Sequence, residues 1–256
     1  MWYGDRIEAD PVSILWHYAT GYLPDFVNKR DGPVRWVRWS HRGVQYLDRI
    51  RITHSQRPYV FSKSFELRFD QAFEAVVGHC ADVTRPAIQK RSGQTWITPE
   101  LAQGLLELHR MGYAHSFEAW AEGQLAGGIW GVQVGGLITM SSMFSRVRNA
   151  GRFAMGRAML HLRDRGFRMV DMGMVPDHHV HFGAEWIPQW KYEAMLPELL
   201  RESLTIGEGY EPRPIPWQVR VGVPMVRVAR GLRRRLGGRG QGTGVGTREW
   251  QTGSGQ

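Results

Sequence analysis

The chain has 256 residues, of which 42% are apolar and 11% aromatic, so it is long enough to bury a sizeable core. No apolar run approaches the ~20 residues that a membrane-spanning helix needs. Charged residues between positions 5 and 10 interrupt the apolar region that a signal peptide requires. Cys80 is the single cysteine, which excludes an intramolecular disulfide bond. These features predict a folded protein of the reducing cytoplasm.

The formal net charge of +9 is concentrated at the C-terminus. Residues 220–256 hold eight arginines and one acidic residue, a net charge of +7, so residues 1–219 carry only +2. Several prolines followed by a glycine-rich end predict that residues 207–256 form a largely disordered basic tail. The tail is either a solvated extension or an arm that binds RNA phosphates or an anionic membrane surface.

Residues 1–90 are predicted to form a small N-terminal α/β domain. Its first helix is capped by Asp10 and starts with a proline. Short strands are expected over residues 34–39 and 49–53. A second helix, capped by Asp70, would place four apolar side chains on one face, namely those of Phe73, Val76, Val77 and Cys80.

Residues 95–206 are predicted to form a larger domain with alternating helices and strands. Its first helix starts at the pair Thr98-Pro99 and stops at Gly112. This order of elements favours an α+β fold with a GNAT-type acyltransferase core, a mixed sheet flanked by helices. The elements expected after the first helix are strands over residues 116–122, 125–134 and 137–144, a helix over 150–165, a strand over 167–172 and a helix over 192–201.

Glycines in the middle strand of this domain mark the expected substrate site. Gly127, Gly128 and Gly131 lie inside residues 125–134. Glycine inside a strand indicates a bulge, or a place where a ligand or another backbone comes close. We therefore expect substrate to lie along this strand.

Five motifs in this domain keep a fixed order over about 55 residues. They are Thr95-Trp96-Ile97-Thr98, Leu108-His109 with Gly112, Ala114-His115-Ser116-x-Glu118-x-Trp120, Leu125-x-Gly127-Gly128-x-x-Gly131-Val132, and Ser142-Met143-Phe144-Ser145 with Asn149-Ala150. Together they resemble the leucyl/phenylalanyl-tRNA protein transferases. The resemblance implies a GNAT-type core after a smaller N-terminal domain, and a reaction without a cofactor. An amine would attack the ester that joins leucine, phenylalanine or methionine to the 3′ end of tRNA.

Asp171 is the first candidate for this chemistry. It lies near the end of the strand predicted over residues 167–172, among apolar neighbours, so its carboxylate needs a partner. The resemblance matches it to the aspartate of an Asp-x-Gln motif implicated in the family's active site. The α-ammonium group of a substrate would be such a partner. The alternative is an arginine or a backbone donor.

Positions that face the substrate depart from the family's pattern. The glutamine of the Asp-x-Gln motif is Gly173, and the glutamate before Ser-Met-Phe-Ser is Ser141, which offers a hydrogen bond but no charge. The tryptophan that seats the terminal adenosine corresponds to Asp25, which removes roughly 1–3 kcal/mol of stacking. Two further aromatic positions are occupied by Leu105 and Ala158.

The resemblance also implies where the donor binds. Trp96 is a stacking platform for the adenosine or, alternatively, an ordinary core residue. The glycines Gly127 and Gly128 would lie beside the aminoacyl group. The predicted apolar pocket for its side chain is formed by Ile129, Ile138, Met155, Ala158 and Leu162.

A cluster of histidines follows the Asp171 strand. His178, His179 and His181 lie close together, but no CxxC or HExxH pattern accompanies them, so we expect no metal site. His178 matches a family histidine. Because the pKa of histidine lies near neutrality, His178 or His181 is a candidate for the proton transfer of the missing glutamine. The alternative is a set of solvated loop histidines.

The residues leave several functions open. The first is transfer from aminoacyl-tRNA to a protein that begins with arginine or lysine, or from the same donor to a small-molecule amine. The second is acyl transfer from acyl-CoA, for which residues 148–153 match two of the three fixed positions of a phosphate-binding helix start. The third is an inactive descendant that binds RNA or protein.

Overall fold

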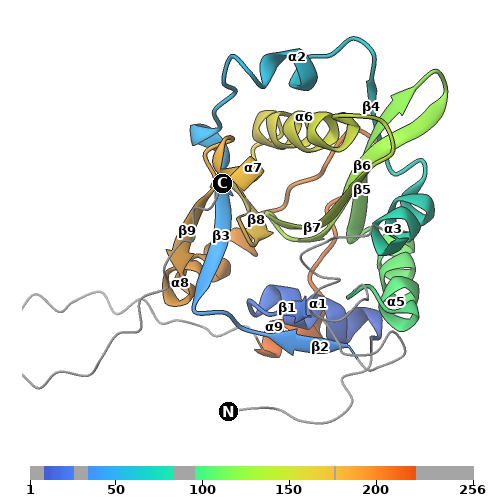
Figure 1. The fold of residues 1–256 in the computed structure, drawn as a ribbon. Helices are drawn as coiled ribbons and strands as arrows, with labels where there is room; N and C mark the ends of the chain where they lie inside the picture. The colour runs from blue at the N-terminus through green and yellow to red at the C-terminus, as the bar shows by residue number, and fades with distance from the viewer. Residues whose placement is uncertain (1–8, 26–33, 83–95, 176, 223–256) are drawn as a thin grey trace, which may run out of the picture. The chain divides into compact units, whose positions relative to one another are not determined.

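A computed structural model describes residues 9–25, 34–82, 96–175 and 177–222 of the chain, all within one compact unit that spans residues 1–226 (Figure 1). A second unit, residues 227–256, lies outside the described residues. The helices are α1 (Pro11–Ala19), the short 3-10 helix η1 (Leu47–Arg49), α2 (Arg57–Val60), α3 (Phe73–Asp82), α5 (Pro99–Arg110), α6 (Ala150–Asp164), α7 (Asp177–Val180), α8 (Gln189–Leu199) and α9 (Trp217–Gly222).

Most strands belong to one mixed sheet. They are β1 (Leu23–Asp25), β2 (Arg35–Val37), β3 (His41–Tyr46), β4 (Glu66–Phe69), β5 (Ala114–Ala121), β6 (Gln124–Val134), β7 (Leu137–Ser145), β8 (Met169–Gly173) and β9 (Glu185–Pro188). The sheet has the order β4-β5-β6-β7-β8-β3-β9, while β1 and β2 form a separate pair. Within the sheet, β7 and β8 are parallel and the other described pairs are antiparallel. The protein is therefore an α+β fold with a mixed sheet flanked by helices.

Two helix starts that local sequence predicts are confirmed. The Asp10 side chain accepts hydrogen bonds from the backbone N–H groups of Val12 and Ser13, both at 3.0 Å, at the start of α1. Thr98 accepts from the backbone N–H of Leu101 at 3.2 Å and begins α5. Each cap satisfies backbone donors that the helix itself leaves unpaired, which is why the motif is readable from sequence.

The three predicted strands after α5 are also confirmed. Strands β5, β6 and β7 form two successive hairpins with eight and eight register pairs. The first turn uses Glu122 and Gly123, at φ values of 50° and 75°, and the second uses Gly135 at 61°. These left-handed conformations are the ones that tight hairpin turns require.

Two predictions for the N-terminal region are wrong. Residues 50–53 form no strand, and β3 lies earlier, between β8 and β9 in the sheet. Its buried polar residues Arg42 and Gln45 hide the strand from a hydropathy pattern. Asp70 does not cap α3. It adopts φ of 56° and accepts from the backbone N–H of Ser116 at 2.6 Å and from His115 Nδ1 at 2.8 Å. The predicted apolar face of α3 is confirmed, because its four residues are buried.

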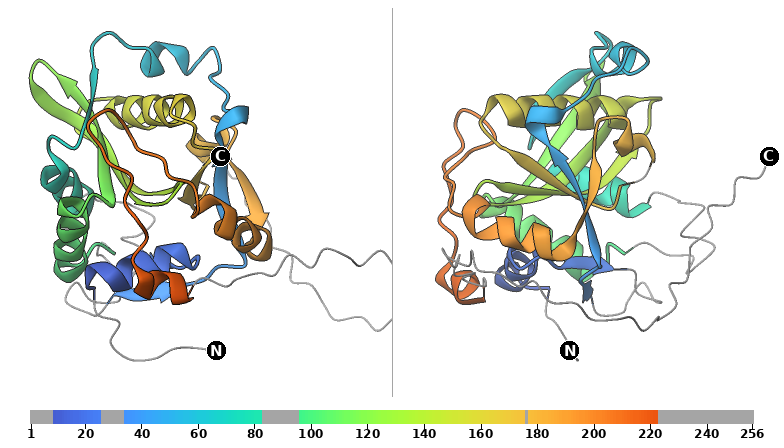
Figure 2. Two further views of the ribbon diagram at one scale, coloured as in Figure 1. Left: turned by 180° about the vertical axis from the view of Figure 1, so that it is seen from behind. Right: turned by 90° about the vertical axis from the view of Figure 1, so that its left-hand side faces the viewer.

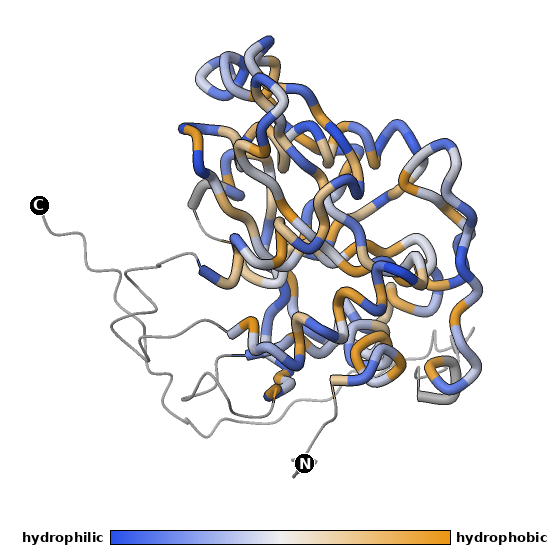
Figure 3. Tube along the Cα trace, turned by 90° about the vertical axis from the view of Figure 1, so that its right-hand side faces the viewer, coloured by the Kyte–Doolittle hydropathy of each residue, from blue (hydrophilic) through white to orange (hydrophobic). Residues whose placement is uncertain are grey.

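Two apolar cores lie on opposite faces of the sheet. Helix α6 covers one face, while α1, α5 and α8 pack against the other (Figure 1 and Figure 2). Along the tube in Figure 3, hydrophobic and hydrophilic positions alternate at short intervals, as amphipathic elements require. Adjacent strand residues therefore serve different layers. Ile138 joins the core under α6, whereas the neighbouring Thr139 faces Asp171 on the other side.

The predicted domain boundary near residue 90 falls in residues 83–95, outside the described residues, and stays a prediction. The sheet itself takes strands from both sides of that boundary. Residues 207–222 of the predicted tail are described, and Val219 of α9 is buried in the core that contains α1. The rest of the tail lies outside the described residues. Over the described ranges, no helix is both long enough and apolar enough to cross a membrane.

Candidate active site

The candidate site is built where β7 and β8 pair. These strands are joined by two register pairs, Ile138 with Val170 and Thr139 with Asp171. Strand β3 lies against the other edge of β8, with Val44 opposite Asp171. Three strands thus bring polar side chains to one face of the sheet, where α1 and α8 cover them. We call Tyr18, Arg42, Thr139, Ser141, Asp171 and Tyr192 the Asp171 cluster.

The carboxylate of Asp171 is fully buried, and both of its oxygens accept hydrogen bonds. Arg42 binds it with two nitrogens, Nε to Oδ1 at 2.8 Å and Nη2 to Oδ2 at 2.5 Å. Thr139 Oγ1 and the Tyr192 hydroxyl donate to Oδ2 at 3.0 and 2.7 Å, and the backbone N–H of Gly173 donates to Oδ1 at 2.9 Å. Five donors saturate the acceptor capacity of a carboxylate. The partner predicted for Asp171 is therefore an arginine, supported by hydroxyl and backbone donors.

Arg42 is held as completely as Asp171. Its side chain is fully buried, its Nη1 donates to the carbonyl oxygen of Gly21 at 3.1 Å, and its guanidinium lies over the Tyr192 ring at 4.7 Å. Burial, followed by the negative charge of Asp171, raises the pKa of the Tyr192 phenol well above its ordinary value. Tyr192 therefore keeps its proton and acts as a donor.

Ser141 lies two residues beyond Thr139 on β7, where the register with β6 shifts by one residue, and its contact with α1 places its side chain on the side of the Asp171 cluster. Its hydroxyl is 3.1 Å from the Tyr18 hydroxyl of α1, and the residue is only partly buried. Burial raises the pKa of Tyr18, so this phenol also stays protonated. Within the Asp171 cluster, Ser141 is the predicted catalytic residue whose side chain reaches the surface while its position is fixed by a second hydroxyl.

The predicted pocket residues lie together but are packed in the core. Ile129, Ile138, Met155, Ala158 and Leu162 are at most 2% exposed and belong to the apolar core under α6. They occupy the face of the sheet opposite the Asp171 cluster. Their predicted role in holding an aminoacyl side chain is not tested by this packing and stays a prediction.

The strand glycines let helices approach the sheet. A Cβ on Gly127 would lie 2.8 Å from the Ala150 Cβ and from the Gly151 backbone nitrogen, at the start of α6. A Cβ on Gly128 would lie 3.2 Å from Val76 of α3 on the other face. Close backbone approach, which the sequence indicates for this strand, thus occurs at protein neighbours.

The remaining predicted residues are spread around the fold. Trp96 is 7% exposed, with its ring 5.8 Å from that of Trp130 in the core. Asp25 lies opposite Arg35 in the β1–β2 pair, and Leu105 is buried in α5. His178 belongs to α7, but its side chain is outside the described part of the chain.

Sequence reasoning missed Arg42, Tyr18 and Tyr192 as members of the Asp171 cluster. The two tyrosines lie on helices, where they are indistinguishable from core aromatics. The sequence indicates that a buried aspartate needs a partner, but it does not identify which arginine is that partner. Arg42 is 129 positions away in the chain.

The sequence is similar to those of known proteins. The sequence model of the family described as leucyl/phenylalanyl-tRNA protein transferase matches residues 44–197. A leucyl/phenylalanyl-tRNA protein transferase of Rhizorhabdus wittichii is 37% identical over 73% of this chain and 73% of its own length. One of Synechococcus is 38% identical over 76% and 97%.

Solved structures resemble the chain more weakly. The C-terminal domain of a protein described as a lysylphosphatidylglycerol synthetase, from Agrobacterium fabrum, aligns with a TM-score of 0.39 and 13% identity over 58% of each chain.

Proposed function

The chain belongs to the leucyl/phenylalanyl-tRNA protein transferase family, and from this premise we propose that it joins a hydrophobic amino acid from charged tRNA to an amine acceptor. The amino acid is leucine, phenylalanine or methionine, and the simplest acceptor is the N-terminus of a protein that begins with arginine or lysine. The observation that carries the proposal is the family match over residues 44–197, which includes the strands from β4 to β9.

The reaction is an aminolysis. The acceptor nitrogen forms a bond to the ester carbonyl carbon, the bond from that carbon to the tRNA 3′ oxygen breaks, and a proton passes from nitrogen to the leaving oxygen. Because the ester is already activated, much of the acceleration can come from holding the amine beside it. Well-oriented groups reach effective molarities on the order of 10⁵ M or more. A hydrogen bond to the carbonyl oxygen or to the amine adds to this effect.

The proposal includes a GNAT-type core. Its support is the element order from α5 through β8 and the parallel pair β7–β8, whose pairing covers only two residue pairs. Beyond Thr139 and Asp171 the described pairing of β7 with β8 ends. We place the ester beside Ser141, the next residue on that face of β7.

Within this site Asp171 acts as a positioning residue. Its five donors leave no lone pair for a substrate ammonium group, and Arg42 already compensates its charge. What it fixes is the end of β8, through Gly173, and the side chain of Arg42 on β3. Ser141, backed by Tyr18, is the group proposed to exchange a hydrogen bond with the reacting amine or carbonyl.

A small-molecule amine is the second candidate acceptor. The observation that favours it is the loss of the two family side chains proposed to hold and deprotonate the acceptor, since Ser141 and Gly173 stand in their places. Neither residue carries a charge that would attract an ammonium group. The donor, charged tRNA, is the same in both candidates.

The basic tail is proposed to contact RNA phosphates. Residues 220–256 carry eight arginines and one acidic residue, and a charged tRNA is a polyanion. A substrate of this kind also favours the cytoplasm as the place where the protein works.

The test is a transfer assay with the full chain. The protein is incubated with tRNAs charged with leucine, phenylalanine and methionine, or separately with acetyl-CoA, and a peptide that begins with arginine. Mass spectrometry should show one added hydrophobic residue with charged tRNA and no acetyl group with acetyl-CoA. An otherwise identical peptide with a blocked N-terminus should remain unmodified.

Two variants locate the chemistry. Ser141→Ala should slow transfer at least about tenfold, because a lost catalytic hydrogen bond of this kind costs at least about 1.4 kcal/mol. Ser64→Ala, at an exposed serine in the loop before β4, should have wild-type activity. Acetylation without aminoacyl transfer would overturn the proposal. Transfer to a small amine but not to the peptide would replace the first acceptor by the second.

A further inference from the structure

The charge of residues 1–219 is unevenly distributed. Two segments, residues 52–65 and 123–162, contain no aspartate or glutamate and together hold six cationic side chains. Because residues 1–219 carry a net charge of only +2, the rest of that range carries −4. A body that is nearly neutral as a whole therefore contains one strongly positive region. We call its six cationic residues the α6 face, namely Arg57, Lys63, Arg146, Arg148, Arg152 and Arg157.

The fold brings these two segments together. Helix α2 lies over α6 on the side away from the sheet (Figure 1). The helices are in close contact, because a Cβ on Gly156 of α6 would be 2.9 Å from a side chain of α2. On either side of this contact, the guanidinium groups of Arg152 and Arg157 lie over the rings of Tyr59 and Phe61, at 5.9 and 6.0 Å. These cation–π contacts hold the cations of α6 beside those of the α2 segment.

The charges of the α6 face are not compensated within the described part of the chain. None of the six residues has an ion pair there. Five of them are exposed, and Arg157 is partly buried. By contrast, the exposed Arg163 near the end of α6 pairs with Asp164 at 2.8 Å. The α6 face therefore matches an anionic partner outside the chain.

The residue types of the α6 face are those that bind phosphate. Five of the six are arginines, and a guanidinium binds a phosphate group through two parallel N–H donors. A cation–π contact uses the flat face of a guanidinium, so its N–H donors are left for such bonds. The ring of Phe61, which is 47% exposed, lies among these cations and offers a surface on which a base can stack. A nucleic acid supplies both phosphates and bases.

The α6 face also begins close to the proposed reaction site. Arg146 directly follows β7 and is five residues beyond Ser141, so their Cα atoms are at most about 18 Å apart. A strand of a nucleic acid helix advances about 3.4 Å per nucleotide, so about five nucleotides span this distance. A tRNA whose 3′ end lies at Ser141 therefore has phosphates at the distance of Arg146.

We propose that the α6 face binds the phosphate backbone of the donor tRNA, at a distance from the aminoacyl end. The proposal rests on the proposed function, because that function supplies tRNA as the polyanion. Its contacts are to phosphates, which position a nucleic acid without reading its sequence. Binding therefore needs neither the aminoacyl group nor the transfer reaction, and uncharged tRNA is a sufficient probe.

Fluorescence anisotropy with labelled, uncharged tRNA and the full chain tests the proposal. A triple variant with Arg146→Gln, Arg148→Gln and Arg152→Gln should bind tRNA at least about tenfold more weakly at about 0.1 M salt. Each lost phosphate contact lowers the slope of log K against log salt by about 0.7–0.9, so the slope should fall by about 2.

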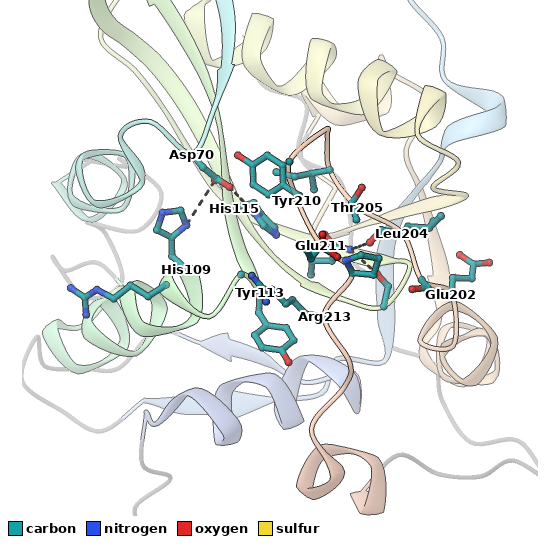
Figure 4. A pocket seen from close by; sticks show the side chains of 18 residues that line it. Asp70, His109, Tyr113, His115, Glu202, Leu204, Thr205, Tyr210, Glu211 and Arg213 are labelled. Carbon is teal, nitrogen blue, oxygen red and sulfur yellow. Dashed lines mark hydrogen bonds and ion pairs between the residues drawn. The ribbon is translucent and has the colours of Figure 1, made fainter.

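A matched control removes the same charge elsewhere, with Arg110→Gln, Arg201→Gln and Arg213→Gln. Arg110 and Arg213 line a cavity of about 310 Å³ beside the end of α5 (Figure 4), and Arg201 follows α8. This control should leave both the affinity and the slope unchanged. Equal effects of the two triple variants would mean that only the total charge matters, which overturns the proposal.

Two further measurements identify the partner and separate this proposal from the proposed function. Lysine at the same three positions keeps the charge and should keep the salt slope, and thermal unfolding shows that each variant is folded. If the glutamine variant loses binding to phosphatidylserine vesicles but not to tRNA, the α6 face is a membrane contact and the proposal is wrong. If wild-type transfer fails while tRNA binding depends on the α6 face, only the proposed function fails. If transfer succeeds and the glutamine variant binds tRNA normally, only the role of the α6 face is refuted.

Discussion

Replacing Asp171 with asparagine should strongly destabilise the protein, because the substitution leaves the guanidinium of Arg42 charged, buried and uncompensated. Both side chains are 0% exposed, and Arg42 makes two of its three described hydrogen bonds to the carboxylate. Asparagine has nearly the same shape as aspartate, so the change tests the charge rather than the packing. Thr139 and Tyr192 retain one acceptor oxygen at this position.

The expected loss is about 3–5 kcal/mol, the cost of removing one partner from a buried ion pair. Because domains are stable by only about 5–15 kcal/mol, this is about a fifth of the total or more. For a unit of this size, each kcal/mol lowers Tm by about 2–4 °C, so the midpoint should fall by roughly 6–20 °C. Adding Arg42→Met should restore part of the loss, because no guanidinium is then left unpaired.

Urea unfolding followed by circular dichroism measures the free energy, and a matched control keeps the chemistry constant. In Asp164→Asn the same substitution breaks an ion pair with Arg163 whose side chains are 65% and 44% exposed. That loss should be under about 1 kcal/mol, as for other exposed pairs. A free energy of unfolding for Asp171→Asn within about 1 kcal/mol of wild type would refute the reasoning.

The same variant separates the two roles of Asp171. Transfer activity is measured at about 10 °C, well below the expected midpoint. If Asp171 positions its neighbours, folded Asp171→Asn should retain measurable turnover. Complete loss of turnover in a variant of wild-type stability would instead identify Asp171 as a group that exchanges a proton with the substrate.

Other predictions follow from single features. Burial lowers the pKa of His17 from 6.5 to about 4, so as pH falls the unfolded chain binds a proton before the folded chain does. The free energy of unfolding should therefore decrease by about 3 kcal/mol as pH drops from about 6.5 to 4. In a series of urea midpoints measured at different pH, His17→Gln should flatten this part of the curve. Gly127→Ala should cost about 1–3 kcal/mol because its Cβ meets Ala150 and the backbone of α6. At Gly78 nothing lies within 4 Å of a new Cβ, so Gly78→Ala should increase the free energy of unfolding by as much as about 1 kcal/mol in the same assay. Deleting residues 223–256 should flatten the salt dependence of RNA binding measured by fluorescence anisotropy, and an unchanged slope would exclude the tail as a phosphate contact.

Local structure followed from local sequence. The caps Asp10 and Thr98 act on backbone groups two or three residues away, and the periodicity of α3 is set by its own residues. The hairpins of β5, β6 and β7 are specified by turns that contain glycine and by the strand residues on either side of each turn. Such elements need no information about distant parts of the chain. The family motifs are also short and continuous, which is why a resemblance could be stated from the sequence.

The arrangement of the Asp171 cluster could not be predicted from nearby residues in the sequence. Strand β3 carries a buried arginine and a glycine, and it is a strand because β8 and β9 provide partners on both sides. Asp70, whose position suggested a helix cap, instead binds His115 and Ser116, more than forty residues further along the chain.

The sequence by itself therefore determined the helices and hairpins that are stabilised by nearby residues, and the family to which their motifs belong. Only the tertiary structure decided that Asp171 is neutralised by Arg42 and that the Ser141 hydroxyl lies beside that of Tyr18. The physical reason is that a buried charge must be compensated, but the compensating group is chosen by how distant strands meet. A sequence shows that a buried aspartate must be compensated, but it does not show which residue compensates it.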